Sequence, residues 1–148
     1  MRYLGLDLGR ARIGLALADD VLRTARPHST VHRRSDAVDL EAIGAVAREY
    51  EVTRAVVGLP LNMDGTEGDS ARFARGFAQK LGAALGMPVA LHDERLSTFE
   101  AEGRLRERGV PARDQRGLID AEAAAVILQS WLDAGATEGA ADPDRSPP

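Results

Sequence analysis

The chain has 148 residues, a length that fits one domain with a single core. Its 44% hydrophobic and 28% charged content is that of an ordinary globular protein. Cysteine is absent, which excludes a disulfide scaffold, a cysteine-based zinc site and a cysteine nucleophile. This composition suits a reducing cytoplasm, where we expect the protein to act. The net charge of -4 does not indicate a nucleic-acid binder, but it does not exclude one, since local patches set phosphate binding.

Residues 3–18 predict two short strands joined by a tight turn. Leucines take every second position of the first strand, so Asp7 points to the opposite face. Glycines surround it at Gly5, Gly9 and Gly14, and we expect them to leave open backbone that a polar ligand can approach. Arg10 and Arg12 follow, which suggests a metal or phosphate site. The alternative is that Asp7 caps the turn through its own backbone.

Residues 23–34 predict a third strand and form the most basic stretch of the chain, with four arginines, two histidines and no acid. Pro27 makes it an edge or bulged strand. Its charges could contact a nucleic-acid backbone, or they could keep an exposed sheet edge from pairing with another strand. The sequence favours neither interpretation.

The remaining chain alternates helices and strands. Ser35 or Asp36 caps a first helix that ends near Glu51, and Asp69-Ser70 caps a second that ends near Leu85. Further strands are expected at 54–60 and 89–94, and further helices at 98–108 and 116–133.

This order predicts an α/β fold with a five-stranded mixed sheet: three antiparallel strands, then parallel strands, with helices on both faces. We expect the domain to span residues 1–134. Residues 135–148 are rich in Gly, Ala, Asp and Pro and predict a disordered tail. No basic segment plus apolar run opens the chain, and no apolar run is long enough to cross a bilayer, so we expect no signal peptide and no membrane contact.

Three acids fall where this topology gathers ligands. Asp7 and Glu94 end the first and last strands, and both lie at the same sheet edge if these strands pair in parallel. Either Asp93 or Glu94 could line the site, because alternation is loose at a strand end; both could also form a solvated turn.

The last helix supplies the third acid. Asp120 shares one helical stripe with Ala124, Ile127 and Trp131, so it faces the sheet, where a carboxylate is costly unless it is paired or metal-bound. The alternative is that Asp120 lies in the first turn of the helix and only interacts favourably with the helix dipole. Three converging carboxylates would repel each other without a cation between them, and such oxygen ligands suit Mg²⁺ or Mn²⁺.

Four motifs in this order resemble the YqgF family, also called RuvX, the pre-16S rRNA nucleases related to the Holliday junction resolvase RuvC. They are LDLGRARIGLA at 6–16, VGLPLNMDGT at 57–66, HDERLST at 92–98 and IDAEAAAVILQ at 119–129. The resemblance implies a ribonuclease H-like fold, divalent-metal phosphodiester hydrolysis and cytoplasmic maturation of the 5′ end of 16S rRNA. The family's acidic positions fall on Asp7, Glu94 and Asp120, which would be both the catalytic residues and the metal ligands.

Other residues beside these acids are candidates for substrate binding. Arg10 and Arg12 could contact phosphate or be exposed turn charges, and Arg95 could steer the backbone or pair with Asp93. Asn62 and Ser97 could orient substrate, although a loop role and a helix cap explain them equally. The expected substrate is pre-16S rRNA, with branched or single-stranded DNA as an alternative. Ribosomal particles and a second copy of the chain are possible partners.

Two other functions fit the same fold. The Asp-x-Gly hairpin at Asp7 also resembles that of the actin, Hsp70 and sugar-kinase ATPases, but those proteins need two such domains. The other possibility is a non-catalytic RNA-binding module that assists ribosome assembly.

Overall fold

The structure is a computed structural model that describes residues 1–94, 97–111, 114–115 and 117–135. Of the predicted tail it describes only Gly135. Among the described residues, no helix is long and apolar enough to cross a membrane.

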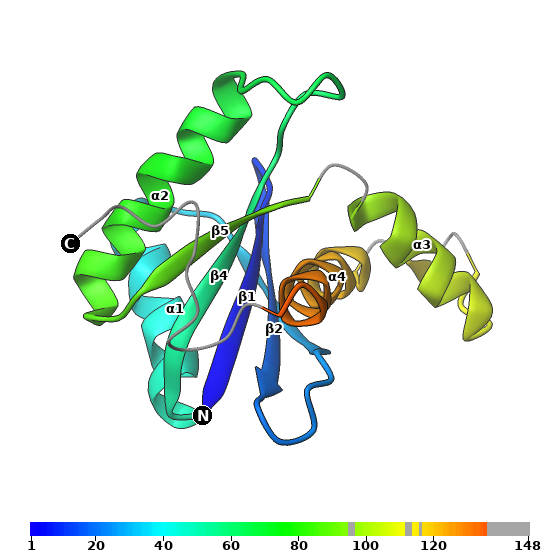
Figure 1. Cartoon of the computed structure of the whole chain (residues 1–148), viewed down its shortest axis with the longest axis horizontal. Helices are drawn as coiled ribbons and strands as arrows, with labels where there is room; N and C mark the ends of the chain where they lie inside the picture. The colour runs from blue at the N-terminus through cyan, green and yellow to red at the C-terminus, as the bar shows by residue number, and fades with distance from the viewer. Residues whose placement is uncertain (95–96, 112–113, 116, 136–148) are drawn as a thin grey trace.

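A five-stranded mixed sheet forms the centre of the molecule (Figure 1). Its strands are β1 (Arg2–Leu8), β2 (Arg12–Asp19), β3 (Arg26–His32), β4 (Val52–Leu59) and β5 (Val89–Asp93), in the spatial order β3-β2-β1-β4-β5. β2 is antiparallel to β1 and β3, whereas β4 is parallel to β1 and β5. The first and last strands therefore run parallel as predicted, but they do not pair, because β4 lies between them.

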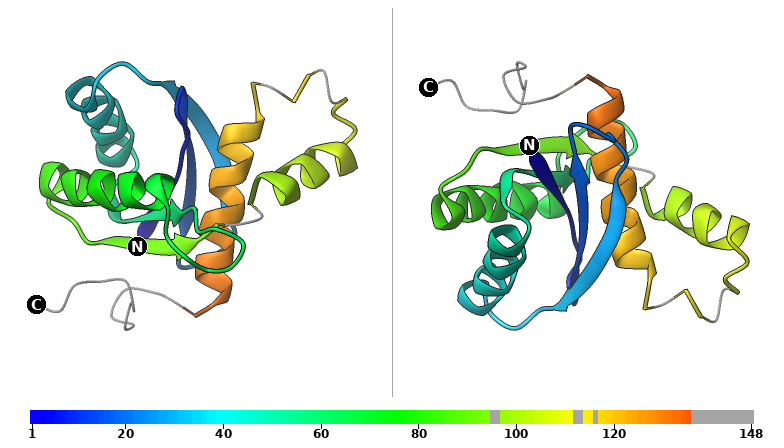
Figure 2. Two further views of the ribbon diagram at one scale, coloured as in Figure 1. Left: turned by 90° about the horizontal axis from the view of Figure 1, so that it is seen from above. Right: turned by 90° about the horizontal axis from the view of Figure 1, so that it is seen from below.

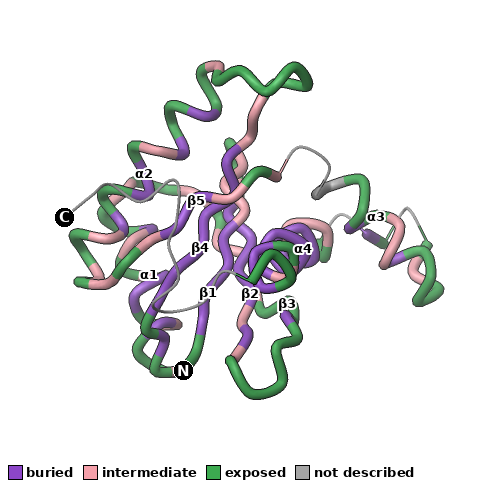
Figure 3. Tube along the Cα trace, viewed as in Figure 1, coloured by how far each residue is buried: buried purple, intermediate pink, exposed green. Residues whose placement is uncertain are grey.

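Helices cover both faces of the sheet, as predicted (Figure 2). α1 (Asp36–Glu49) and α2 (Asp69–Leu85) lie on one face, where the alternating leucines of β1 form the larger core with them. α4 (Ile119–Asp133) lies on the other, and α3 (Ser97–Glu107) packs outside it. Most of α4 is buried (Figure 3), including its stripe of Ala124, Ile127 and Trp131.

Glycines allow α4 to lie directly on the backbone of the sheet. A Cβ at Gly14 of β2 would lie 1.9 Å from the carbonyl oxygen of Asp120. A Cβ at Gly5 of β1 would lie 2.7 Å from Cβ of Leu128. The prediction that these glycines leave room for a ligand is wrong, because the helix fills that space. Gly9 is also covered, since a Cβ there would lie 2.7 Å from the carbonyl oxygen of Arg12.

The ends of the elements agree only in part with the local sequence signals. β3 is an edge strand with an irregular register opposite Leu15 and Ala16, as Pro27 predicts. The Ser35 hydroxyl accepts a hydrogen bond from the amide of Val38 and caps α1. At α2 the predicted cap is wrong: Gly68 is the N-cap and makes no side-chain bond. Asp69 is the first helical residue, and its carboxylate pairs with Arg72 one turn later.

Replacing Gly14 by alanine should destabilise the protein by about 1–3 kcal/mol, because the methyl group would collide with the backbone of α4. Gly76→Ala is the matched control. Gly76 is an exposed residue inside α2 with open space around its Cβ position, so alanine there should stabilise by about 0.5–1 kcal/mol. Urea unfolding of both variants measures the difference. An unchanged midpoint for Gly14→Ala would contradict the close packing of α4.

Candidate active site

The three predicted acids come together at the carboxyl end of the parallel strands. Asp7 lies near the end of β1, opposite Gly14 of β2, and Glu94 directly follows β5. Asp120 lies in the first turn of α4, whose backbone rests on that same Gly14. The packing of α4 against the sheet therefore carries the third acid toward the first.

Glu94 reaches Asp7 across β4, and a glycine makes this possible. Gly58 of β4 pairs with His92 of β5 and presents no side chain. A Cβ there would lie 3.0 Å from Cδ of Glu94 and 2.7 Å from Cδ1 of Ile127. The Glu94 side chain thus lies over Gly58, and its carboxyl group hydrogen-bonds that of Asp7.

This contact changes the protonation of Asp7. Burial, followed by the charge and the hydrogen bond of Glu94 and by the charge of Asp120, raises the pKa of Asp7 to about 8. Two carboxyl groups can share a hydrogen bond only if one of them holds a proton. Near neutral pH the pair therefore binds a proton that an isolated aspartate would release, which is typical of carboxylates gathered for a cation or for catalysis.

Asp120 is held by an arginine in this structure. Nε of Arg12 donates to Oδ2 of Asp120 at 2.7 Å, and both side chains are partly buried. Arg12, a predicted phosphate contact, is thus an ion-pair partner of the third acid. Within the described part of the chain, no three His, Asp or Glu side chains are arranged so as to hold a metal ion.

A second ion pair fixes the same end of α4. Glu122 is almost fully buried and accepts two hydrogen bonds from the Arg108 guanidinium, at 3.2 and 2.8 Å. This pair raises the pKa of Arg108 further above its ordinary value through the hydrogen bond and charge of Glu122. It joins the segment after α3 to α4 and so stabilises the position of the first turn that carries Asp120.

The other predicted site residues differ in their surroundings. Arg10 is exposed and has no hydrogen-bond or ion-pair partner among the described residues. The Asn62 side-chain amide donates to Oγ1 of Thr66 at 2.9 Å and so closes its own loop. Arg95 lies outside the described residues. Ser97 begins α3, but its side chain also lies outside what the structure describes.

His92, the first residue of the HDERLST motif, joins two elements of the fold. Its Nε2 lies 2.8 Å from the Ser130 hydroxyl, which joins β5 to α4. Nothing in this contact makes it a general base.

The basic segment at 23–34 has divided roles. Arg23 donates to the carbonyl of Leu132 at the end of α4, and Arg33 joins the β1–β2 turn to α1. Arg26, His32 and Arg34 are exposed on or beside the edge strand. Part of this segment is therefore structural, and contact of its exposed residues with nucleic acid stays a prediction.

Sequence reasoning missed Gly58. It lies in a short apolar run that predicts a buried strand, and nothing in that run indicates which residue faces the acids. Its place two residues before Pro60 puts it near the carboxyl end of that strand, but the pairing of the strand with β1 is visible only in the structure.

The raised pKa predicts how stability depends on pH. Native Asp7 holds its proton up to about pH 8, whereas the unfolded chain releases it near the ordinary value of 3.8. Its stabilising contribution is thus complete below that lower value and is lost as the pH rises through the higher one. Asp7→Asn should therefore be more stable than the parent at pH 9, by an amount of the order of a few kcal/mol, with the gap closing toward pH 4. Thermal melts in the presence of a chelator measure this gap, and a gap that does not vary with pH would contradict the shared proton.

Gly58→Ala should separate Glu94 from Asp7, because the new methyl group would take the space of the Glu94 side chain. With its negative neighbour moved away, Asp7 should titrate at a lower pH than in the parent. Carbon-detected NMR titration of the Asp7 carboxyl group measures the shift. Gly76→Ala serves as the control, and an unchanged Asp7 titration in Gly58→Ala would show that Glu94 does not depend on this glycine.

Comparison with known proteins finds relatives that cover most of the chain. Relatives named "Putative pre-16S rRNA nuclease" include one from Anaeromyxobacter dehalogenans (strain 2CP-C), 76% identical over 133 residues, covering 90% of this chain and 97% of the relative. Another, from Myxococcus xanthus (strain DK1622), is 51% identical over 134 residues, covering 90% and 89%.

Solved structures show the same fold. Thermus thermophilus RuvC in complex with a Holliday junction substrate aligns with a TM-score of 0.61 at 18% identity, covering 96% of this chain and 98% of that one. The nuclease of the large terminase from thermophilic phage G20c aligns with a TM-score of 0.55 at 12% identity, covering 88% and 81%. The expected ribonuclease H-like architecture is thus confirmed. The family model for RuvX, described as Holliday junction resolvase, matches residues 1–134, and the chain belongs to this family of nucleases.

Proposed function

We propose that this protein is a divalent-metal-dependent nuclease that processes the 5′ end of pre-16S rRNA in the cytoplasm, with Asp7, Glu94 and Asp120 as its metal ligands. The observation that carries the proposal is the Asp7–Glu94 pair. Two carboxyl groups hydrogen-bond each other at a strand end, with a third in electrostatic reach. An arrangement that costs free energy in the folded protein is best explained by a cation that it is built to hold.

The residues fit Mg²⁺ or Mn²⁺. The donors are carboxylate oxygens, which these hard cations prefer, and the chain contains no cysteine that would favour a softer metal. Asp7 and Glu94 already share a proton, and a cation would replace it. Asp120 would join them by exchanging its ion pair with Arg12. When bound, such an ion activates water and stabilises the charge that develops on a phosphodiester during hydrolysis.

The protein's own residues then bind and orient the strand. Arg10 is exposed at the β1–β2 turn, two residues beyond β1, where an unpartnered guanidinium can contact a phosphate oxygen. Arg12, once released from Asp120, would be a second phosphate contact on the same turn. Burial of Asp7 keeps its own carboxyl group away from bulk water, which strengthens its electrostatic interactions.

The choice of RNA rests on the relatives, whose printed names refer to pre-16S rRNA at identities up to 76%. Branched DNA is the second candidate, because the family description is that of a Holliday junction resolvase. A protein acting on two strands of a junction would need two active sites, hence two copies of the chain. The net charge of -4 favours a substrate held by the metal and a few arginines over broad electrostatic binding.

Replacing any of the three acids by its amide should lower the cleavage rate of a pre-16S rRNA fragment by about 100-fold or more in Mn²⁺ or Mg²⁺, because electrostatic stabilisation is usually the largest catalytic contribution. Calorimetry should show weaker Mn²⁺ binding in Asp7→Asn. Glu49→Gln, an exposed acid on α1, is the matched control and should leave both unchanged.

A junction DNA assayed in parallel decides between the substrates. Faster cleavage of the junction than of the RNA would favour the resolvase. If the parent cleaves nothing and RNA binding survives the loss of all three acids, the protein would be a non-catalytic ribosome-assembly factor and not a nuclease. Full cleavage activity in Asp7→Asn would contradict the assignment of Asp7 to the active site.

A further inference from the structure

A cavity of about 320 Å³ lies at the same end of the sheet, on the face opposite Asp7. It is lined by Leu8, Gly9, Arg10, Arg33, Asp69, Ser70 and Phe73. The residues come from the β1–β2 turn, the segment after β3 and the first turns of α2. None of the three acids belongs to it, so the proposed hydrolysis leaves it unexplained.

The cavity presents an aromatic ring that lies outside the larger buried core. Phe73 is 46% exposed although it lies on the helix that carries the larger core, whereas Phe77 beside it is buried. The Arg33 guanidinium lies 4.8 Å from the centre of the Phe73 ring and 5.5 Å from that of Phe77. Arg33 thus supports Phe73, and a large part of the ring remains open to the cavity.

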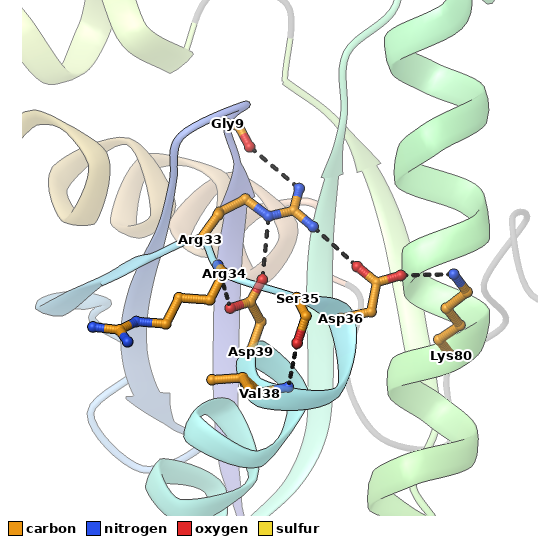
Figure 4. A network of polar contacts seen from close by, with 8 residues as sticks. All are labelled: Gly9, Arg33, Arg34, Ser35, Asp36, Val38, Asp39 and Lys80. Atoms are coloured by element: carbon orange, nitrogen blue, oxygen red, sulfur yellow. Dashed lines mark hydrogen bonds and ion pairs between the residues drawn. The ribbon is translucent and has the colours of Figure 1, made fainter.

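The polar network around Arg33 fixes this support (Figure 4). Its guanidinium donates to Asp36 at 3.2 Å, to Asp39 at 3.4 Å and to the Gly9 carbonyl at 3.5 Å. Asp36 also accepts from Lys80 of α2 at 2.7 Å. Arg33 is held by the β1–β2 turn and by α1, which is itself tied to α2, so the ring it supports is preorganised for a flat partner.

The charged residues that line the cavity differ in whether they have a partner. Arg33 is neutralised by Asp36 and the buried Asp39, and Asp69 is paired with Arg72. Among the described residues Arg10 alone of the charged lining residues has no partner. One half-exposed aromatic ring and one unpaired guanidinium are the two groups that a nucleotide unit requires, the first for its base and the second for its phosphate.

The position links this cavity to the acids. Leu8 and Gly9 directly follow Asp7, and successive residues of a strand point to opposite faces. A strand laid across the end of β1 would therefore pass from the acids on one face to the cavity on the other. Arg10, at the tip of the turn between them, would contact the backbone on the way.

We propose that this cavity takes an unpaired nucleobase of the substrate strand, close to the phosphodiester that is cut, with the base stacked on Phe73 and its phosphate at Arg10. The inference rests on the proposed nuclease function and adds a subsite to it. It implies that the substrate is single-stranded beside the cut, because a paired base cannot enter such a cavity.

Binding of short single-stranded RNAs tests the subsite, with Asp7→Asn as the parent so that the strand stays intact. A fluorescent adenine analogue is placed at successive positions. At one position its emission should be quenched on binding, and Phe73→Ala or Phe73→Leu should abolish the quenching and weaken binding about 10-fold. Phe73→Tyr should keep both the quenching and the binding affinity of the parent. Phe99→Ala, which removes a 72% exposed ring on α3, is the matched control and should change neither.

An abasic RNA completes the test. Removing the base at the quenched position should weaken binding to the parent as much as Phe73→Ala does, and should have no further effect on that variant. Thermal melts establish that the variants are folded. Unchanged binding and quenching in Phe73→Ala and Phe73→Leu would overturn the subsite, even where cleavage by the wild type depends on Asp7. Quenching that depends on Phe73 in a protein that cleaves nothing would support the subsite and reject the nuclease.

Discussion

The direct contact of α4 with the backbone of the sheet is the constraint on which the site depends. Side chains on Gly5 or Gly14 would keep α4 away from the sheet, and a side chain on Gly58 would displace Glu94. Because these positions carry no side chain, the buried stripe of α4 packs against β1 and β4. At the far end of α4, the centre of the Trp131 ring lies 5.3 Å from the centre of the Tyr3 ring. A helix fixed at that end can carry Asp120 to Asp7 at the other.

The fold tolerates an unfavourable group of charges because two cores surround it. Leucines of β1 and β2 join α1 and α2 on one face, and alanines of α4 fill the other. Hydrophobic burial of this extent outweighs the cost of pressing Asp7 against Glu94. At Asp7, stability and the proposed activity would therefore oppose each other, as is common where catalytic groups are gathered.

Periodicity was enough to predict the elements, their order and the two helical layers, because alternation in β1 and the stripe of α4 report burial directly. It also indicated Asp7 and Asp120, but it left Asp93 and Glu94 as alternatives, and only the family resemblance selected Glu94. It could not predict that Arg12 would pair with Asp120, since that contact joins residues 108 positions apart. The glycines were interpreted as room for a ligand, because sequence does not tell which neighbour fills the space above a strand.

The irregular edge strand β3 limits how copies of this protein can meet. Pro27 lacks an amide hydrogen, and the register break beside it interrupts the regular row of donors and acceptors. Extending the sheet from one molecule into the next is therefore disfavoured at this border. A pair of copies that acts on two strands would therefore meet elsewhere than at β3: through helical surfaces, at the opposite edge strand β5 or by way of the nucleic acid itself.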